Sequence, residues 1–522
     1  MIKFWRKVGQ LILIGMTVMA CSGVNPSSRD PGLESSLSGQ TSRVPTSVGA
    51  SSAMASETPE PGAQSQNGIT PTSEPAMLSR SEGALQENTS RTQYQLDAVL
   101  DYENHHLKVE QNILYTNQSQ DTLEDLLLVV EPSRYPDVFH LQSITLPDGQ
   151  PVEYERDIGQ VRLTLSQPLA PENRVQINLS YELALPSPDS DYYGRPVPFG
   201  YSPRQTNLVD WYPFLPPYID GQGWLVHQAG FFGEHLVYPA ADFQVSIQLS
   251  SPNPDLVIAA SAPAEQDGNI YRYHHLKARN FAWSASHVYQ VTEEQVGDVR
   301  VLSYAFPNHN EAADAALQTT SQALALYTQL FGPYPHKTLS VVEADFLDGM
   351  EYDGLYYLSH AFYNLYGGTQ GEYLVAIAAH ETAHQWFFGL VGNDQALEPW
   401  LDEALCTYSE RLYYENISAR ALDWWYQYRI NYYQPRGWVD GNIYNPEGYR
   451  AYRDAVYLNG ALFLDELRSL MGDSAFFELL KDYVSQYSGS IANEEAFFNL
   501  LENHTQADLT NLLGKYFANK VW

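Results

Sequence analysis

The sequence predicts a multi-domain protein in which an antiparallel, β-sandwich-like domain is followed by an α+β domain that is mostly helical. The spacing of apolar residues leads to this prediction. They alternate with polar residues from Tyr94 to about Val296, whereas their spacing becomes helical from Glu311 onward. With 522 residues, of which 44% are hydrophobic, the chain is long enough for two or three domains with large cores.

The chain begins with a basic stretch and a short apolar run, which together are typical of a secretory signal peptide over residues 1–21. The apolar run of about ten residues is too short for a membrane-spanning helix, which needs about 20. Val-Met-Ala-Cys at 18–21 resembles the bacterial lipobox, whose cysteine receives lipid. We therefore expect a lipoprotein that is anchored to a bacterial cell membrane through Cys21 and is extracytoplasmic. The alternative is an ordinary signal peptide with an incidental cysteine.

Residues 22–91 are rich in Ser, Gly, Pro, Thr, Gln and Glu and contain almost no aromatic residue. Such a segment cannot bury enough apolar surface to fold, so we expect a disordered linker. The folded part then divides into an N-terminal β-domain over residues 92–296 and a second domain over residues 297–522.

Within these domains, alternation and helical spacing predict the individual elements. The strands predicted in the first domain are 94–100, 109–115, 123–130, 161–165, 175–181, 243–249, 256–260 and 270–274. In the second domain, a helix is predicted over 311–331, where Gly332-Pro333 ends it, and a strand over 338–342. The later helical runs are 373–388, 455–471, 474–486, 493–502 and 508–517.

Composition excludes several classes of partner. The chain has 29 Lys and Arg against 62 Asp and Glu, a formal net charge of −33. Because nucleic acids and anionic membrane surfaces bind basic patches, neither is expected as a main partner. With two cysteines, the chain has no disulfide scaffold and no cysteine-based metal cluster.

His380-Glu381-Thr-Ala-His384 lies in an apolar helical run. Two histidines four apart share one helix face and can reach one ion, and Glu381 beside the first can address a water on that ion. Glu403 stands nineteen positions beyond His384, at the start of another helix. Two His and one Glu form a common catalytic zinc set, so the spacing predicts a zinc site. The alternative is a polar helix face.

The spacing of these three side chains is similar to that of peptidase family M1, the gluzincin aminopeptidases. Residues 348–352, Asp-Gly-Met-Glu-Tyr, resemble the family's Gly-Ala-Met-Glu-Asn motif. Residues 456–461, Val-Tyr-Leu-Asn-Gly-Ala, resemble its Val-Tyr-Glu-Lys-Gly-Ala segment, and residues 280–286 resemble the end of its N-terminal β-domain. The resemblance covers about residues 92–520.

The resemblance implies a zinc metallopeptidase catalytic domain of thermolysin-like α+β fold over residues 297–522. It implies one Zn²⁺ per chain, with peptides as substrates. The roles it implies are metal ligands for His380, His384 and Glu403, catalysis for Glu381 and Tyr457, and substrate binding for Glu351, Gly349 and Met350. Tyr452 is the competitor for the role of Tyr457. Asp394 and Asp402 are candidates for orienting the ligand imidazoles.

The activity that this resemblance implies first is that of an aminopeptidase, which removes N-terminal residues from peptides. Two alternatives stay open: a zinc endopeptidase with an open cleft, and a membrane-tethered peptide-binding protein with an inactive site. Asp348 and Tyr352 depart from the family motif, and we identify no second acidic residue for the substrate's amino group in the N-terminal domain. We expect a short lipoprotein form without the family's C-terminal helical domain.

Overall fold

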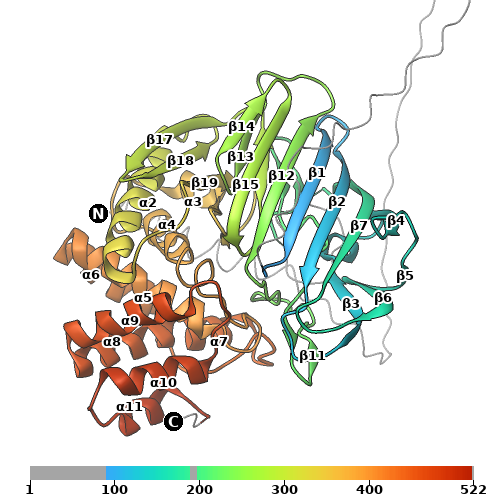
Figure 1. The fold of residues 1–522 in the computed structure, drawn as a ribbon. Helices are drawn as coiled ribbons and strands as arrows, with labels where there is room; N and C mark the ends of the chain where they lie inside the picture. The colour runs from blue at the N-terminus through green and yellow to red at the C-terminus, as the bar shows by residue number, and fades with distance from the viewer. Residues whose placement is uncertain (1–89, 188–196, 520–522) are drawn as a thin grey trace, which may run out of the picture. The chain divides into compact units, whose positions relative to one another are not determined.

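The structure is a computed structural model that describes residues 90–187 and 197–519, which belong to one compact unit (Figure 1). The predicted signal peptide, Cys21 and nearly all of the predicted linker lie outside the described residues. Along the described chain, no helix has both the length and the apolar character that crossing a membrane requires.

The largest sheet of the described region has the strand order β14-β15-β12-β1-β2-β7-β4 (Figure 1). Its strands are β1 (Gln93–Asp101), β2 (His106–Thr116), β4 (Phe139–Thr145), β7 (Arg174–Ala184), β12 (Ala241–Leu249), β14 (Ala264–Asp267) and β15 (Ile270–Ala278). Neighbours are antiparallel except β1 and β12, which are parallel because a long connection separates β7 from β12. Alternate residues of β2, among them Leu107, Val109 and Ile113, are buried, as expected for a strand with one face on a core.

Smaller sheets complete the β-rich part. One has the order β13-β16-β9-β8, another the order β3-β6-β5, and β10 pairs with β11. Their strands are β3 (Leu123–Val129), β5 (Glu153–Asp157), β6 (Gln160–Leu169), β8 (Gly200–Tyr201), β9 (Thr206–Leu208), β10 (Tyr218–Ile219), β11 (Gly223–Trp224), β13 (Val257–Ala260) and β16 (Trp283–Ser286). The predicted order, a β-rich domain before a helical one, is confirmed.

A further sheet, with the strand order β17-β18-β19-β21-β20, belongs to the helical part of the chain. Its strands are β17 (Gln290–Val296), β18 (Val299–Ala305), β19 (Thr338–Ala344), β20 (Gly349–Tyr352) and β21 (Leu355–Ser359). The predicted domain boundary between 296 and 297 falls in the turn of the β17–β18 hairpin, so both strands of that hairpin belong to this sheet. The boundary itself stays a prediction.

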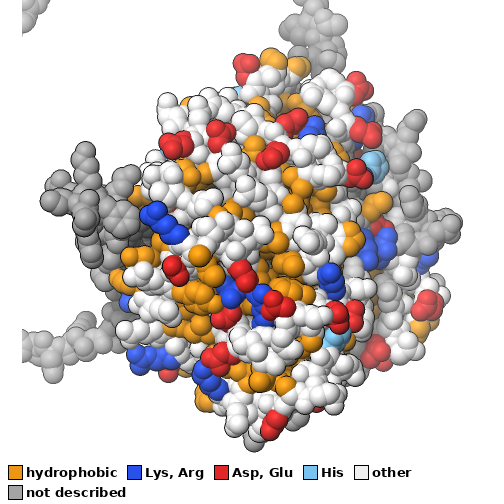
Figure 2. Space-filling model, turned by 90° about the vertical axis from the view of Figure 1, so that its left-hand side faces the viewer, with side chains coloured by type: hydrophobic (Ala, Val, Ile, Leu, Met, Phe, Trp, Pro, Cys, Tyr) orange, Lys and Arg blue, Asp and Glu red, His pale blue; other side chains and the backbone are white. Residues whose placement is uncertain are grey.

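The helices gather on the opposite side of this sheet from the large β-sheet (Figure 1). They are α2 (Asn310–Phe331), α3 (His360–Leu365), α4 (Tyr373–Ala383), α5 (Trp400–Ile417), α6 (Ala419–Trp424), α7 (Tyr449–Arg453), α8 (Gly460–Met471), α9 (Asp473–Tyr487), α10 (Glu494–His504) and α11 (Thr510–Tyr516). On the face shown in Figure 2, acidic, basic and hydrophobic side chains are mixed.

Helix α4 is shorter than the helical run predicted over 373–388, because the chain leaves the helix in a tight turn after His384. The backbone N–H of Gly389 donates to the carbonyl of His384 (2.8 Å), and Phe388 adopts a φ of 134°. A side chain at position 389 would crowd the carbonyl of Gln385, so the turn requires glycine there. His380 lies in the last turn of the helix, and His384 is the C-cap residue that directly follows it.

Candidate metal centre and active site

The three predicted ligands converge, although α4 and α5 contribute them separately. Nε2 of His380 lies 3.1 Å from Oε2 of Glu403 and 3.1 Å from Nε2 of His384, and the third separation, His384 to Glu403, is 3.6 Å. All three side chains are buried. Ligands about 2.0–2.1 Å from a tetrahedral zinc lie about 3.3 Å apart, so this spacing fits Zn²⁺.

Nδ1 of each imidazole makes a hydrogen bond, and this orients Nε2 of both rings toward the same point. Nδ1 of His380 donates to Oε1 of Glu410 (3.0 Å), and Nδ1 of His384 donates to the carbonyl of Phe387 (3.1 Å). Two nitrogen lone pairs that face each other at 3.1 Å repel unless a cation lies between them. The donor set therefore fits a metal.

Glu410, which the sequence analysis missed, orients His380. It is buried and also accepts hydrogen bonds from Nε and NH2 of Arg429 (2.9 and 2.8 Å) and from Nε1 of Trp425 (2.9 Å). Burial alone would raise the pKa of Glu410, but Arg429 and His380 lower it, so the carboxylate stays ionised. A signal was present in the sequence, because Glu410 lies seven residues, about two helical turns, after Glu403.

The residues predicted to orient the imidazoles bond elsewhere. Asp394 accepts a hydrogen bond from Nε2 of His227 (2.9 Å), and Asp402 accepts one from Nε2 of Gln395 (3.1 Å). The expectation for Asp394 and Asp402 was wrong. It rested on nearness in the sequence, whereas the orientation of helix α5 brings Glu410 to His380.

Glu381 points its carboxylate toward β20. Burial, together with the nearby Glu351 and Glu403, raises its pKa to about 8 despite the opposing effect of the two histidines. Among the described residues, no group donates a hydrogen bond to its Oε2. A Cβ atom at Gly349 would collide with Oε1 of Glu381, so the glycine leaves the space that this carboxylate occupies.

Tyr457 lies in a π-helical turn, Asp454–Asn459, a wide turn that is common at functional sites. Its hydroxyl donates to Oε1 of Glu403 (2.6 Å), and its ring is nearly parallel to that of His380. Burial, reinforced by Glu403, raises the pKa of Tyr457 well above its usual value, so the hydroxyl remains a donor. Tyr452, the competing residue, packs its ring 5.1 Å from that of Phe232.

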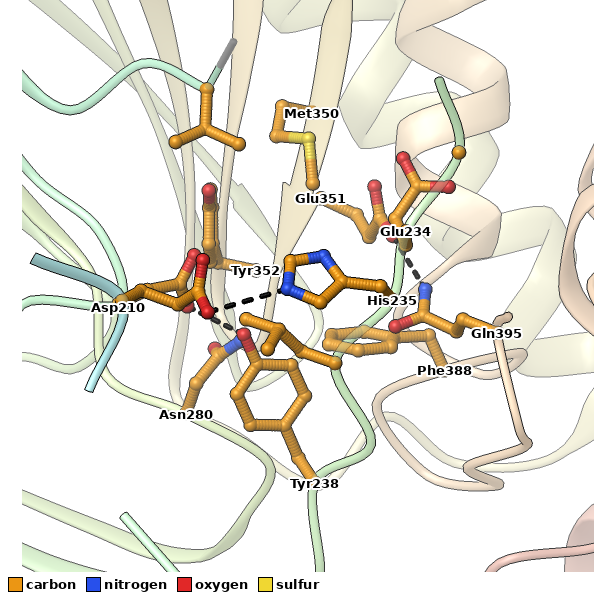
Figure 3. A pocket seen from close by; sticks show the side chains of 14 residues that line it. Asp210, Glu234, His235, Tyr238, Asn280, Met350, Glu351, Tyr352, Phe388 and Gln395 are labelled. Carbon is orange, nitrogen blue, oxygen red and sulfur yellow. Dashed lines mark hydrogen bonds and ion pairs between the residues drawn. The ribbon is translucent and has the colours of Figure 1, made fainter. Parts of the chain in front are cut away.

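A pocket lies beside this group, and Figure 3 shows its acidic lining. Glu351 is buried on β20 and accepts a hydrogen bond from Nε2 of Gln395 (2.9 Å), while Met350 lines the same pocket. Glu234, from the irregular segment between β11 and β12, extends its carboxylate beside that of Glu351 (Figure 3). Sequence reasoning missed Glu234 because no motif or periodic pattern surrounds it.

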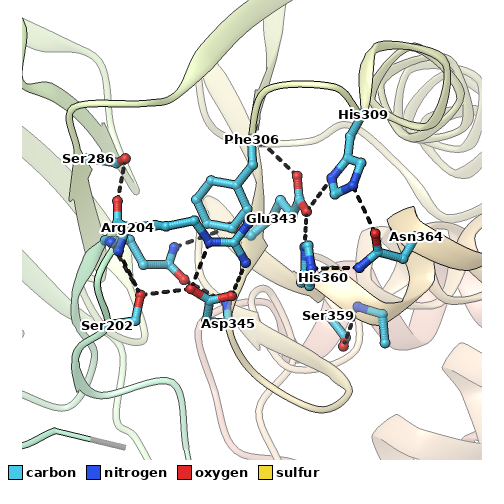
Figure 4. A network of polar contacts seen from close by, with 12 residues as sticks. Ser202, Arg204, Ser286, Phe306, His309, Glu343, Asp345, Ser359, His360 and Asn364 are labelled. Atoms are coloured by element: carbon cyan, nitrogen blue, oxygen red, sulfur yellow. Dashed lines mark hydrogen bonds and ion pairs between the residues drawn. The ribbon is translucent and has the colours of Figure 1, made fainter.

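A second His/Glu group lies outside this site, at the ends of β18, β19 and β21 (Figure 4). Nδ1 of His309 and Nδ1 of His360 each lie 2.7 Å from Oε1 of Glu343, which is a hydrogen-bond distance. The amide nitrogen of Asn364, a donor, meets Nε2 of His360 (2.6 Å), so the ring proton of His360 lies on the Glu343 side. We interpret this group as a hydrogen-bonded network rather than a metal site.

Comparison with known proteins shows what part of the chain is similar to them. Residues 315–516 match the model of the peptidase family M1 domain. Aminopeptidase M1-D of Oryza sativa is 27% identical over 217 residues, 38% of this chain and 24% of that protein. Aminopeptidase N of Lactobacillus helveticus is 25% identical over 299 residues, 52% of this chain and 35% of that protein. The chain thus matches about a quarter to a third of the length of these relatives.

Solved structures share the fold over almost their whole length. The M1 zinc metallopeptidase of Deinococcus radiodurans aligns with a TM-score of 0.57 at 18% identity, over 82% of this chain and 94% of that one. Its E323A mutant, solved bound to Tyr-ser-ala substrate, aligns with a TM-score of 0.58 at 18% identity, over 83% of this chain and 95% of that one. At this identity the likeness concerns the fold. Residues 315–516, which match the peptidase family M1 domain, include the two histidines and the glutamate that converge, and the fold is that of M1 zinc metallopeptidases.

Proposed function

We propose that this protein is a zinc-dependent aminopeptidase that removes N-terminal residues from peptides. The observation that carries the proposal is the position of Glu351, which lies within 4.8 Å of Glu381 and His384 and lines one pocket together with Glu234 (Figure 3). Relatives that match the chain are named aminopeptidases, and a structural neighbour was solved with a peptide substrate.

In this proposal His380, His384 and Glu403 hold one zinc ion. Zinc, when bound, supplies a Lewis acid that polarises a carbonyl and makes water acidic enough to react near neutral pH. The two neutral imidazoles and one carboxylate leave a net positive charge at the ion, which favours this chemistry.

Two side chains then move or hold protons. Glu381, whose Oε2 accepts no hydrogen bond from the described residues, accepts a proton from the attacking water and returns it to the leaving amine. The hydroxyl of Tyr457 turns from Glu403 to the oxygen of the reacting carbonyl and donates a hydrogen bond as negative charge develops there.

Glu351 and Glu234 together bind the ammonium group of the substrate's N-terminus, because two carboxylates, one buried and one half-buried, favour a cation with several N–H donors. Gly349 and Met350 complete this wall, Gly349 by leaving room for Glu381. This pairing favours an aminopeptidase over an endopeptidase, which has no need to neutralise an N-terminal charge.

The test compares a fluorogenic peptide that has a free N-terminus with the same peptide acetylated. An aminopeptidase should cleave the acetylated peptide at least about 10²-fold more slowly, because the carboxylates are left without a partner. Equal cleavage of both peptides would establish the endopeptidase. Absence of any chelator-sensitive turnover would establish the peptide-binding protein with an inactive site.

We further propose that Cys21 carries lipid and anchors the protein, outside the cytoplasm, to a bacterial cell membrane. The Val-Met-Ala-Cys sequence at 18–21 and the short apolar run before it support this. In cells that express the full chain, a labelled fatty acid should be incorporated into the protein and the protein should sediment with membranes. Cys21→Ser should abolish both. Unchanged labelling of Cys21→Ser would contradict the anchor.

A further inference from the structure

Arg279 follows β15 in the β-rich part of the chain, and its side chain is buried against the turn that ends the metal-binding helix. Within the described residues, its guanidinium donates to five backbone carbonyls. These are Phe388 (3.1 Å) and Gly389 (3.0 Å) from Nε, Leu390 (2.8 Å) and Ser490 (2.7 Å) from Nη2, and Tyr238 (3.1 Å) from Nη1. Burial lowers the pKa of Arg279 to about 10, so it is charged at neutral pH.

The carbonyls of residues 388–390 form a turn that also determines the orientation of a metal ligand. Phe387, one residue earlier, presents the carbonyl that accepts Nδ1–H of His384. Gly389 closes the turn onto the carbonyl of His384, and Phe388 is held at a φ of 134°, a conformation that is strained for a residue other than glycine. A turn under such strain keeps its shape only if neighbouring groups hold it, and Arg279 supplies bonds to three of its carbonyls.

Residues 279–280 also hold the end of β20, the strand that carries Glu351. The backbone N–H of Arg279 donates to Oδ2 of Asp353 (2.9 Å), and Oδ1 of Asn280 accepts the backbone N–H of Asp353 (3.0 Å). Asp353 directly follows β20, which carries Glu351. Residues 279–280 therefore hold the end of β20 and the turn after the metal-binding helix α4 in one arrangement.

We propose that Arg279 is a positioning residue of the metal site. Its guanidinium holds the turn 387–390 so that the carbonyl of Phe387 keeps Nδ1–H of His384 engaged and directs Nε2 of His384 at the ion. The proposal rests on the zinc site of the proposed function. A cation is suited to this place because the carbonyls at a helix C-terminus carry partial negative charge.

The experiment measures the zinc dissociation constant of the holoprotein by competition with a chromophoric chelator, together with kcat, KM and melting temperature. Arg279→Met should weaken zinc binding about 10–100-fold, the range found when a partner of a metal ligand is lost. It should lower kcat more than KM. Arg279→Lys, which keeps the charge but has three donors in place of five, should fall between wild type and Arg279→Met.

Arg468→Met is the matched control, because Arg468 is also largely buried and paired, with Glu415 (2.7 Å) and Asp473 (2.9 Å), but lies on helix α8, which contributes none of the metal ligands. It should lower the melting temperature and leave zinc binding unchanged. If Arg279→Met loses stability but binds zinc as tightly as Arg468→Met, Arg279 is merely structural and the proposal is overturned. If Arg279→Met does not fold, Arg279→Lys decides. Wild-type zinc affinity in Arg279→Lys would then overturn the proposal.

The readout with zinc alone separates this inference from the proposed function. A wild-type protein that binds zinc but cleaves no peptide contradicts the aminopeptidase and leaves the effect of Arg279→Met on zinc binding as the deciding result. A wild-type protein that binds no zinc overturns both.

Discussion

The glutamates around the metal centre have the same side chain but different surroundings. Burial alone would raise the pKa of Glu403, but the adjacent His380 and His384 lower it, so the carboxylate is ionised and suited to bind a cation. The same histidines also act on Glu381, but burial together with Glu351 and Glu403 outweighs them and raises its pKa to about 8. The contacts of Glu403 suit it to be a metal ligand, whereas Glu381 can exchange a proton near neutral pH.

At the residue scale, Glu381→Gln should retain zinc and lose about 10²–10⁴-fold in kcat, the range that a general base contributes. The amide cannot accept a proton, whereas the three ligands stay unchanged. Zinc content by elemental analysis and peptide turnover are the measurements. Normal turnover of this variant would show that another group is the base.

Tyr457→Phe should lower kcat about 10²–10³-fold with little change in KM, because the hydroxyl acts on charge that develops in the transition state. Tyr452→Phe is the matched control and should remain close to wild type. If Tyr452→Phe loses activity and Tyr457→Phe keeps it, the roles of the two tyrosines are exchanged.

At the scale of elements, helix α10 begins with a glutamate beside the start of α5. Oε2 of Glu494 accepts a hydrogen bond from Nε1 of Trp400 (3.1 Å), and its backbone N–H donates to Glu398 (3.1 Å). Burial raises the pKa of Glu494 to about 7. The folded protein therefore keeps this proton up to about pH 7, whereas the unfolded chain loses it above about pH 4.5.

It follows that Glu494 makes the fold less stable as pH rises from about 4.5 to about 7, with no further change above that. Glu494→Gln keeps the acceptor for Trp400 and removes the charge. It should be more stable than wild type by about 1–2 kcal/mol near pH 8, and the gain should vanish near pH 4.5. Urea unfolding of both proteins at the two pH values measures this, and a gain that is independent of pH would contradict it.

At the scale of the whole molecule, a bound metal joins two helices that the chain separates by a loop. Because the ion binds the folded state, removing it with a chelator should lower the melting temperature by about 5–10 °C, and added zinc should restore it. In His384→Ala the chelator should have little effect. A melting temperature that does not respond to the chelator in wild type would show that the ion contributes nothing to the fold.

The sequence by itself determined the features that depend on local periodicity. The spacing of His380 and His384 places both on one face of any helix, because the helical period follows from backbone geometry. Alternation predicted β1, β2, β7, β12 and β15 of the large sheet for the same reason, but not its strands β4 and β14. Glu403 and Tyr457 were reached through motifs. Even so, the parallel pairing of β1 with β12 was not predictable, since it depends on how a long connection crosses the sheet.

Only the tertiary structure decided which side chains support the site. Glu234 and Arg279 come from the β-rich part, far in sequence from the metal ligands, and Glu410 required the orientation of α5. Hydrogen bonds and charge interactions act over a few ångströms in space whatever the distance along the chain. Glu234 and Arg279 stand in no periodic pattern with the metal ligands, and the helical spacing of Glu410 from Glu403 does not show which imidazole it meets, so the fold had to bring these residues together before their part in the site could be recognised.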